Sequence, residues 1–95
     1  MNYVLVFSND GKTVYVAQKE KVGLTVQSIY NSKKSVGCMR EATDSESIIL
    51  EKEEECYNNM INQGDSNKYL LVMESMIDVL KKQLKADDIK ICLRG

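Results

Sequence analysis

The chain has 95 residues, of which 43% are apolar and 28% are charged, and its formal net charge is −1. This composition is typical of a folded globular protein, and the small net charge excludes a global electrostatic attraction to nucleic acid or to an acidic membrane. The length predicts one domain over residues 1–95 with a single hydrophobic core, and a homodimer that covers an exposed apolar face is expected.

The chain begins with a predicted β-hairpin. Residues 3–8 are predicted to form a strand, and residues 3–7 are apolar at successive positions, which indicates that the strand lies inside a sheet and not at its edge. The segment Asn9-Asp10-Gly11 follows, and an Asp-Gly pair between two β-prone segments is a strong hairpin signal because the turn requires positive φ. Residues 13–18 are then the return strand.

Residues 22–35 fit two structures. Their nearly alternating apolar residues suit a strand, whereas Val26, Ile29 and Tyr30 fit one face of a helix that Thr25 would cap. We favour a short helix, because the polar and cationic stretch N-S-K-K-S then forms its C-terminal end.

The segment that begins with Thr43 has the T-x-x-E pattern of a helix capping box. In one interpretation a single helix runs from about residue 44 to residue 63. In the other, residues 47–50 form a short strand and the helix starts near Glu51. Either helix would end at Gly64, which suits the left-handed position after a helix.

The most apolar stretch of the chain predicts a second helix that ends near Leu84. Apolar residues recur there at steps of three and four, which is the spacing of one helix face, at Leu70, Met73, Ile77, Leu80 and Leu84. Asp65 or Ser66 is expected to cap this helix. The short connection from the preceding helix predicts an antiparallel pair, and other elements must cover the apolar face.

Two further strands are predicted. Residues 36–40 form a short strand in which Gly37 marks a bend or bulge. Residues 89–93 alternate between apolar and polar and should join the N-terminal hairpin in one sheet. The predicted fold is therefore α+β: a small, mostly antiparallel sheet, built from the N-terminal hairpin and the C-terminal strand, with two or three helices packed on one face.

The three cysteines, Cys38, Cys56 and Cys92, contain no C-x-x-C pair, which predicts reduced, half-buried thiols and neither a disulfide framework nor a zinc site. The N-terminus has no signal-peptide pattern, and the longest apolar run is far shorter than the about 18–20 residues that span a bilayer. We therefore expect a cytoplasmic protein without membrane partners. Lysine outnumbers arginine 11 to 2, a usage that suggests a bacterial or phage origin.

No catalytic constellation is recognisable. The sequence contains no histidine, so it lacks the commonest general base and the commonest metal ligand. Its five glycines form neither a dinucleotide-binding nor a P-loop pattern. We expect no enzymatic activity, no catalytic residues, no cofactor and no metal.

Charge is strongly segregated along the chain. Residues 1–40 carry six Lys or Arg against two acids, whereas residues 41–55 carry seven acids against one lysine. The acidic stretch predicts a partner-binding surface for a protein with a basic surface, because such faces steer association and set specificity. The predicted partner-binding residues are Glu51, Glu53, Glu54 and Glu55.

These features predict a small non-enzymatic protein that acts by stoichiometric binding to a protein partner, as inhibitors, immunity proteins and phage anti-defence proteins do. The alternative is a binder of a small anionic ligand, nucleotide or nucleic acid through a basic patch of Lys33, Lys34 and Arg40. That patch is small for nucleic acid, which needs several phosphate contacts for high affinity.

Overall fold

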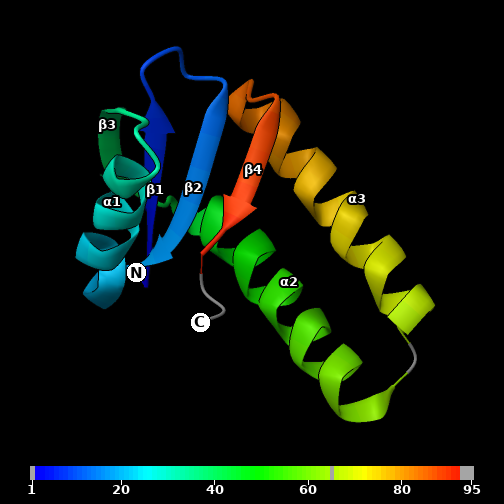
Figure 1. Cartoon of the computed structure of the whole chain (residues 1–95). Helices are drawn as coiled ribbons and strands as arrows, with labels where there is room; N and C mark the ends of the chain where they lie inside the picture. The colour runs from blue at the N-terminus through cyan, green and yellow to red at the C-terminus, as the bar shows by residue number, and fades with distance from the viewer. Residues whose placement is uncertain (1, 65, 93–95) are drawn as a thin grey trace.

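A computed structural model describes residues 2–64 and 66–92 (Figure 1). It contains four strands, three α-helices and one turn of 3₁₀-helix. In chain order they are β1 (Tyr3–Ser8), β2 (Thr13–Gln18), η1 (Lys19–Lys21), α1 (Val22–Asn31), β3 (Val36–Glu41), α2 (Asp44–Gln63), α3 (Ser66–Leu84) and β4 (Asp88–Ile91).

The strands form one sheet in the order β3-β1-β2-β4. The pairs β1–β2 and β1–β3 are antiparallel, whereas β4 lies parallel to β2. The apolar strand β1 is therefore central, as its sequence predicts, and the C-terminal strand joins the hairpin. The predicted α+β class and the mostly antiparallel sheet are confirmed. The predicted strand extended to Leu93, which lies outside the described residues.

The N-terminal hairpin closes as predicted. Gly11 adopts φ 73°, and its amide donates to the carbonyl of Ser8 at 3.0 Å. The carboxylate of Asp10 accepts from the Ser8 hydroxyl at 2.7 Å and from the Lys12 amide at 2.9 Å. A short acidic side chain that bonds its own turn, followed by a glycine that tolerates positive φ, explains why the chain reverses here.

One face of the sheet carries the larger part of the core. Leu5, Val14 and Val16 are fully buried on this face, beneath the helical hairpin formed by α2 and α3. The hairpin covers them with Leu50 of α2 and Leu80 of α3, which are also fully buried. These contacts confirm the predicted pair of helices on one face.

Helix α1 packs on the opposite face of the sheet, where Ile29 forms one buried cluster with Val4, Val6 and Tyr15. The sheet is therefore covered on both sides (Figure 1), and the option of three helices on one face is wrong. The strand alternation explains why: Val4 and Val6 are as apolar as Leu5, so both faces of β1 need cover.

The favoured helix for residues 22–35 is present, but its predicted cap is wrong. Helix α1 begins at Val22, directly after η1, and Thr25 lies within it at 7% exposure. The preceding turn of 3₁₀-helix leads into α1, so the helix starts one turn earlier than the cap prediction placed it. Thr25 then contributes to the buried face.

Helix α2 is continuous from residue 44 to 63, so the alternative strand at 47–50 is wrong. Its capping box is complete: the Glu46 amide donates to Thr43 Oγ1 at 3.3 Å, and the Thr43 amide donates to Glu46 Oε1 at 2.8 Å. Gly64 ends the helix with φ 76°. The predicted cap of the next helix falls on Asp65 and on the Ser66 side chain, which lie outside the described residues.

Gly37 marks a register shift between β1 and β3, as predicted. A Cβ atom at this position would lie 2.7 Å from the carbonyl oxygen of Ser8 and 3.0 Å from Cα of Asn9. The close approach of two backbones at the bulge therefore requires glycine.

In the described part of the chain, no helix combines the length and the apolar character needed to cross a membrane.

We predict that Leu80→Ala lowers the free energy of unfolding by about 3 kcal/mol, because it leaves a cavity under the hairpin. The matched change Leu71→Ala, on the same helix but at a side chain that is 67% exposed, should cost less than about 1 kcal/mol. Urea unfolding followed by circular dichroism measures both. Equal losses would show that α3 packs on the sheet with a different face.

We also predict opposite effects at two glycines. Gly37→Ala should destabilise the protein by more than about 1 kcal/mol, because backbone atoms obstruct its Cβ. Gly23→Ala, in α1 with nothing within 4 Å of its Cβ, should stabilise it by about 0.5–1 kcal/mol by favouring the helix. A tolerated alanine at position 37 in thermal unfolding would contradict the bulge.

Candidate functional site

The four glutamates predicted to form a partner-binding face lie in different environments. Glu53 is only 1% exposed, so it cannot present its carboxylate to a partner. Glu54 is half-buried and accepts a hydrogen bond from the Tyr3 hydroxyl at 2.7 Å. Burial, together with this bond, raises the pKa of Tyr3. Only Glu51 and Glu55, one helical turn apart on α2, remain exposed.

The three predicted anion-binding residues do not converge. Lys33 and Lys34 lie in the loop after α1, whereas Arg40 is in β3. In the antiparallel register Arg40 pairs with Leu5, so it shares the sheet face of the helical hairpin and not that of α1. The basic patch therefore lacks the grouping of cations that phosphate binding requires.

Arg40 is engaged within the fold. Its Nη1 and Nη2 atoms donate to Glu46 Oε1 and Oε2 at 2.8 and 2.9 Å, and its guanidinium lies 5.5 Å from the centre of the Phe7 ring. The same Glu46 carboxylate accepts from the Thr43 amide. Arg40 lowers the pKa of Glu46, and Glu46 raises the pKa of Arg40. Glu46 thus joins an edge strand to the start of α2.

The cysteines are free, as predicted, but only Cys56 is half-buried. Cys38 and Cys92 are exposed, which corrects the prediction that they are half-buried. Both fall on outer strands of the sheet or at their ends, where cover is incomplete. Among the described residues, no group of three His, Cys, Asp or Glu is placed to hold a metal ion.

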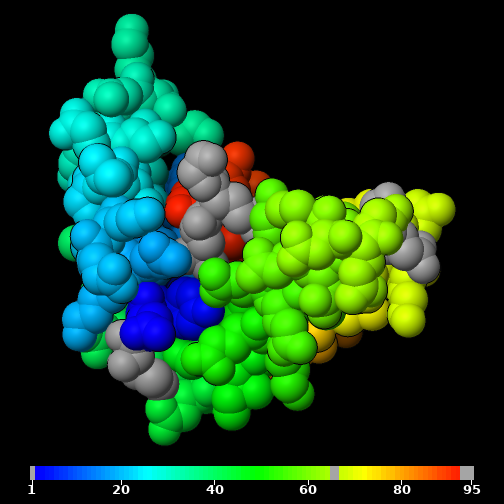
Figure 2. All heavy atoms as spheres, turned by 90° about the horizontal axis from the view of Figure 1, so that it is seen from below, coloured from blue at the N-terminus to red at the C-terminus, as the bar shows by residue number. Residues whose placement is uncertain are grey.

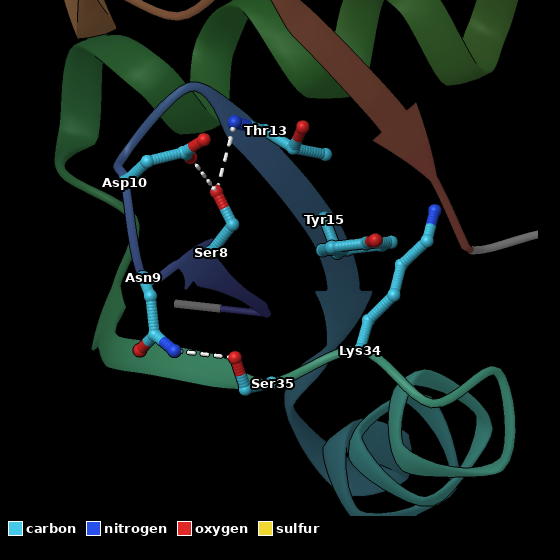
Figure 3. A pocket seen from close by; sticks show the side chains of 7 residues that line it. All are labelled: Ser8, Asn9, Asp10, Thr13, Tyr15, Lys34 and Ser35. Carbon is cyan, nitrogen blue, oxygen red and sulfur yellow. Dashed lines mark hydrogen bonds between the residues drawn. The ribbon is translucent and has the colours of Figure 1, made fainter.

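A polar hollow of about 370 Å³ opens between the β1–β2 turn and the loop after α1 (Figure 3). Much of its polar lining is committed to the fold: Ser8 and Asp10 bond each other, and the Asn9 amide donates to the Ser35 hydroxyl. The Ser8 hydroxyl and then the Lys12 amide lower the pKa of Asp10. These bonds hold the turn in place and do not converge on a ligand.

The helical hairpin extends beyond the sheet. The core under it uses Ile49 and Leu50 from α2, and Ile77, Leu80 and Leu84 from α3. Residues 57–63 and 67–73, which we call the free half of the hairpin, lie beyond these positions. Figure 2 shows this yellow-green projection standing out from the blue and cyan part of the chain.

Large apolar side chains remain exposed on the free half. The exposed fraction is 60% for Ile61, 67% for Leu71, 41% for Leu70 and 39% for Val72. An apolar patch on a projecting element is a common feature of interaction surfaces. The apolar periodicity predicts that other elements cover Leu70, and this prediction is wrong because the elements differ in length. A six-residue strand spans about 20 Å, whereas a 20-residue helix spans about 30 Å, so the helices extend past the sheet.

Comparison with known proteins provides no relative: no protein-family model matches the sequence, and no curated protein or solved structure is significantly similar to it.

We predict that the ion pair between Arg40 and Glu46 makes the free energy of unfolding decrease at acidic pH. The folded state lowers the pKa of Glu46, so its contribution is complete above the ordinary value of 4.5 and is lost as pH falls through the lower folded value. Urea unfolding between neutral pH and pH ~3 should therefore show a steeper acid loss for the wild type than for Glu46→Gln.

The matched control for this experiment is Glu41→Gln. Lys19 lowers the pKa of Glu41 too, but both side chains of that pair are more than half exposed. Solvent screens such a pair, so its removal should change the acid dependence less. A larger change in acid dependence for Glu41→Gln than for Glu46→Gln would contradict the assignment of this dependence to the pair of Arg40 and Glu46.

Proposed function

We propose that this chain is a small non-enzymatic binding domain that acts by stoichiometric association with another protein, through the free half of the helical hairpin. The observation that carries the proposal is the exposure of Ile61 and Leu71 at 60% and 67% on an element that projects from the sheet. When a partner covers exposed apolar side chains, their burial stabilises the complex by about 25 cal/mol for each Å² buried.

The surrounding charges support a protein partner with a basic surface. Glu51 and Glu55 are exposed on α2, and Glu74 and Asp78 are exposed on α3. Carboxylates beside an apolar patch favour a cationic partner and disfavour an acidic one. The inhibitor or immunity type of protein fits this mode of action, and the free cysteines support a cytoplasmic, reducing location.

We predict that Ile61→Ser combined with Leu71→Ser abolishes capture of the partner and leaves the fold intact. The matched control is Leu24→Ser combined with Ile48→Ser, which removes one leucine and one isoleucine of similar exposure, 72% and 53%, from outside the free half. Tagged wild-type and variant chains are incubated with cell extract, and the eluates are quantified by mass spectrometry.

The proposal requires one protein in equimolar amount with the wild type and with the control, and its loss with the free-half variant. Capture that is equal for both double variants would overturn the assignment of the surface. Circular dichroism and the urea midpoint of each variant verify that the fold is retained.

A further inference from the structure

A hollow of about 250 Å³ lies where α3 emerges from beneath the sheet, beside the end of β4. Leu70, Met73 and Ile77 of α3 and Ile91 of β4 supply its apolar lining. We call this hollow the hairpin groove. It differs from the polar hollow beside the β1–β2 turn, whose hydrogen bonds are committed to the fold.

The apolar lining continues the protein core. Leu70 precedes Ile77 by seven residues, which is two helical turns, so both lie on the same face of α3. Ile77 packs against the core under the sheet, whereas Leu70 is 41% exposed. The apolar face of α3 therefore extends about 10 Å, the length of two helical turns, beyond the part that the sheet covers.

The second helix of the hairpin shows the same continuation. Ile61 follows Leu50 by eleven residues, which is three turns, so it faces the same side as Leu50. Leu50 is fully buried against the sheet, and Ile61 is 60% exposed. Two neighbouring helices thus present exposed apolar side chains on the side where the sheet has ended.

The rim of the groove is acidic. Glu74 and Asp78 line it together with one cation, Lys81. Glu53 also lines the hollow, but it is buried and does not present its carboxylate to a partner. Glu74 and Asp78 are exposed and one turn apart, so their carboxylates flank the apolar floor. Of the described ion pairs within 4 Å, none involves Glu74 or Asp78. This charge arrangement favours an occupant that combines apolar and cationic side chains.

We infer that the hairpin groove binds a basic amphipathic helix of a partner protein, with apolar residues at the i, i+3 and i+7 positions over Leu70, Met73 and Ile77 and with Lys or Arg beside Glu74 and Asp78. This inference rests on the proposed function and names its partner by chemistry. Apolar anchors give such a complex most of its affinity, and the charges select the partner.

A synthetic helical peptide tests the inference. Its leucines occupy the i, i+3, i+4 and i+7 positions and its other residues are lysine, and fluorescence anisotropy measures its Kd for the full chain. A second peptide carries glutamate in place of every lysine. The lysine peptide should bind, with an affinity that falls as salt rises, and the glutamate peptide should bind at least about tenfold more weakly.

Two variants locate the peptide on the groove. Glu74→Lys combined with Asp78→Lys should weaken binding about tenfold at low salt, whereas Glu20→Lys, an exposed acid on η1, should leave it unchanged. Leu70→Ser should weaken binding about fivefold, and the control Leu24→Ser should not. If the lysine substitutions disturb folding, Glu74→Gln combined with Asp78→Asn removes the same charges.

Three results would overturn the inference. The first is equal affinity in the groove and control variants. The second is a dimer in sedimentation experiments that Leu70→Ser dissociates, which would assign the groove to a second copy of the chain. The third is peptide binding that appears only in a chain that ends at Cys92, which would assign it to the last residues of this chain.

The outcome also separates this inference from the proposed function. If Ile61→Ser combined with Leu71→Ser abolishes capture of a cell partner but no lysine peptide binds, the binding function stands and the groove assignment fails. If neither the partner nor the peptide binds the wild type, both fail.

Discussion

The burial of Leu50 and Leu80 against Leu5, Val14 and Val16 is the contact on which the rest of the structure depends. It fixes the helical hairpin to the sheet near the start of α2 and the end of α3, so the end of α2 and the start of α3 lie far from the core. Because the hairpin is attached at one end, it projects, and its apolar faces continue where no strand remains to cover them. The exposed surface is therefore a consequence of how the core is placed.

Some charged side chains form contacts within the fold, whereas others remain exposed on the surface. Arg40 and Glu46 form a two-bonded pair that ties an edge strand to the start of α2, and Glu54 accepts from Tyr3. Much of the charge segregation in the sequence therefore serves internal contacts. Such pairs favour one arrangement of strand and helix, because either partner alone would leave a partly buried charge without compensation. The carboxylates of α3 remain on the surface.

The sequence predicts elements well where a local signal exists. The Asp-Gly turn, the capping box at Thr43 and the glycine at position 64 each act within a few residues, and each is confirmed. The chain leaves α1 through Lys33, two residues after the last helical residue Asn31, in the left-handed conformation, which a lysine does not signal. The separation of Lys34 from Arg40, the burial of Glu53 and the overhang of Leu70 depend on strand order and on relative element lengths. These are properties of the assembled fold that residue spacing along the chain does not contain.

The parallel pairing of β4 with β2 joins residues 13–16 to residues 88–91. Residues up to 91 must be synthesised before this ladder can form, so the outer edge of β2 stays open while the ribosome makes α2 and α3. An unpaired strand edge is a template for association with other chains. Contacts between such distant segments also slow folding, because a long loop must close first. The last strand thus ends the interval in which the nascent protein is most prone to aggregate.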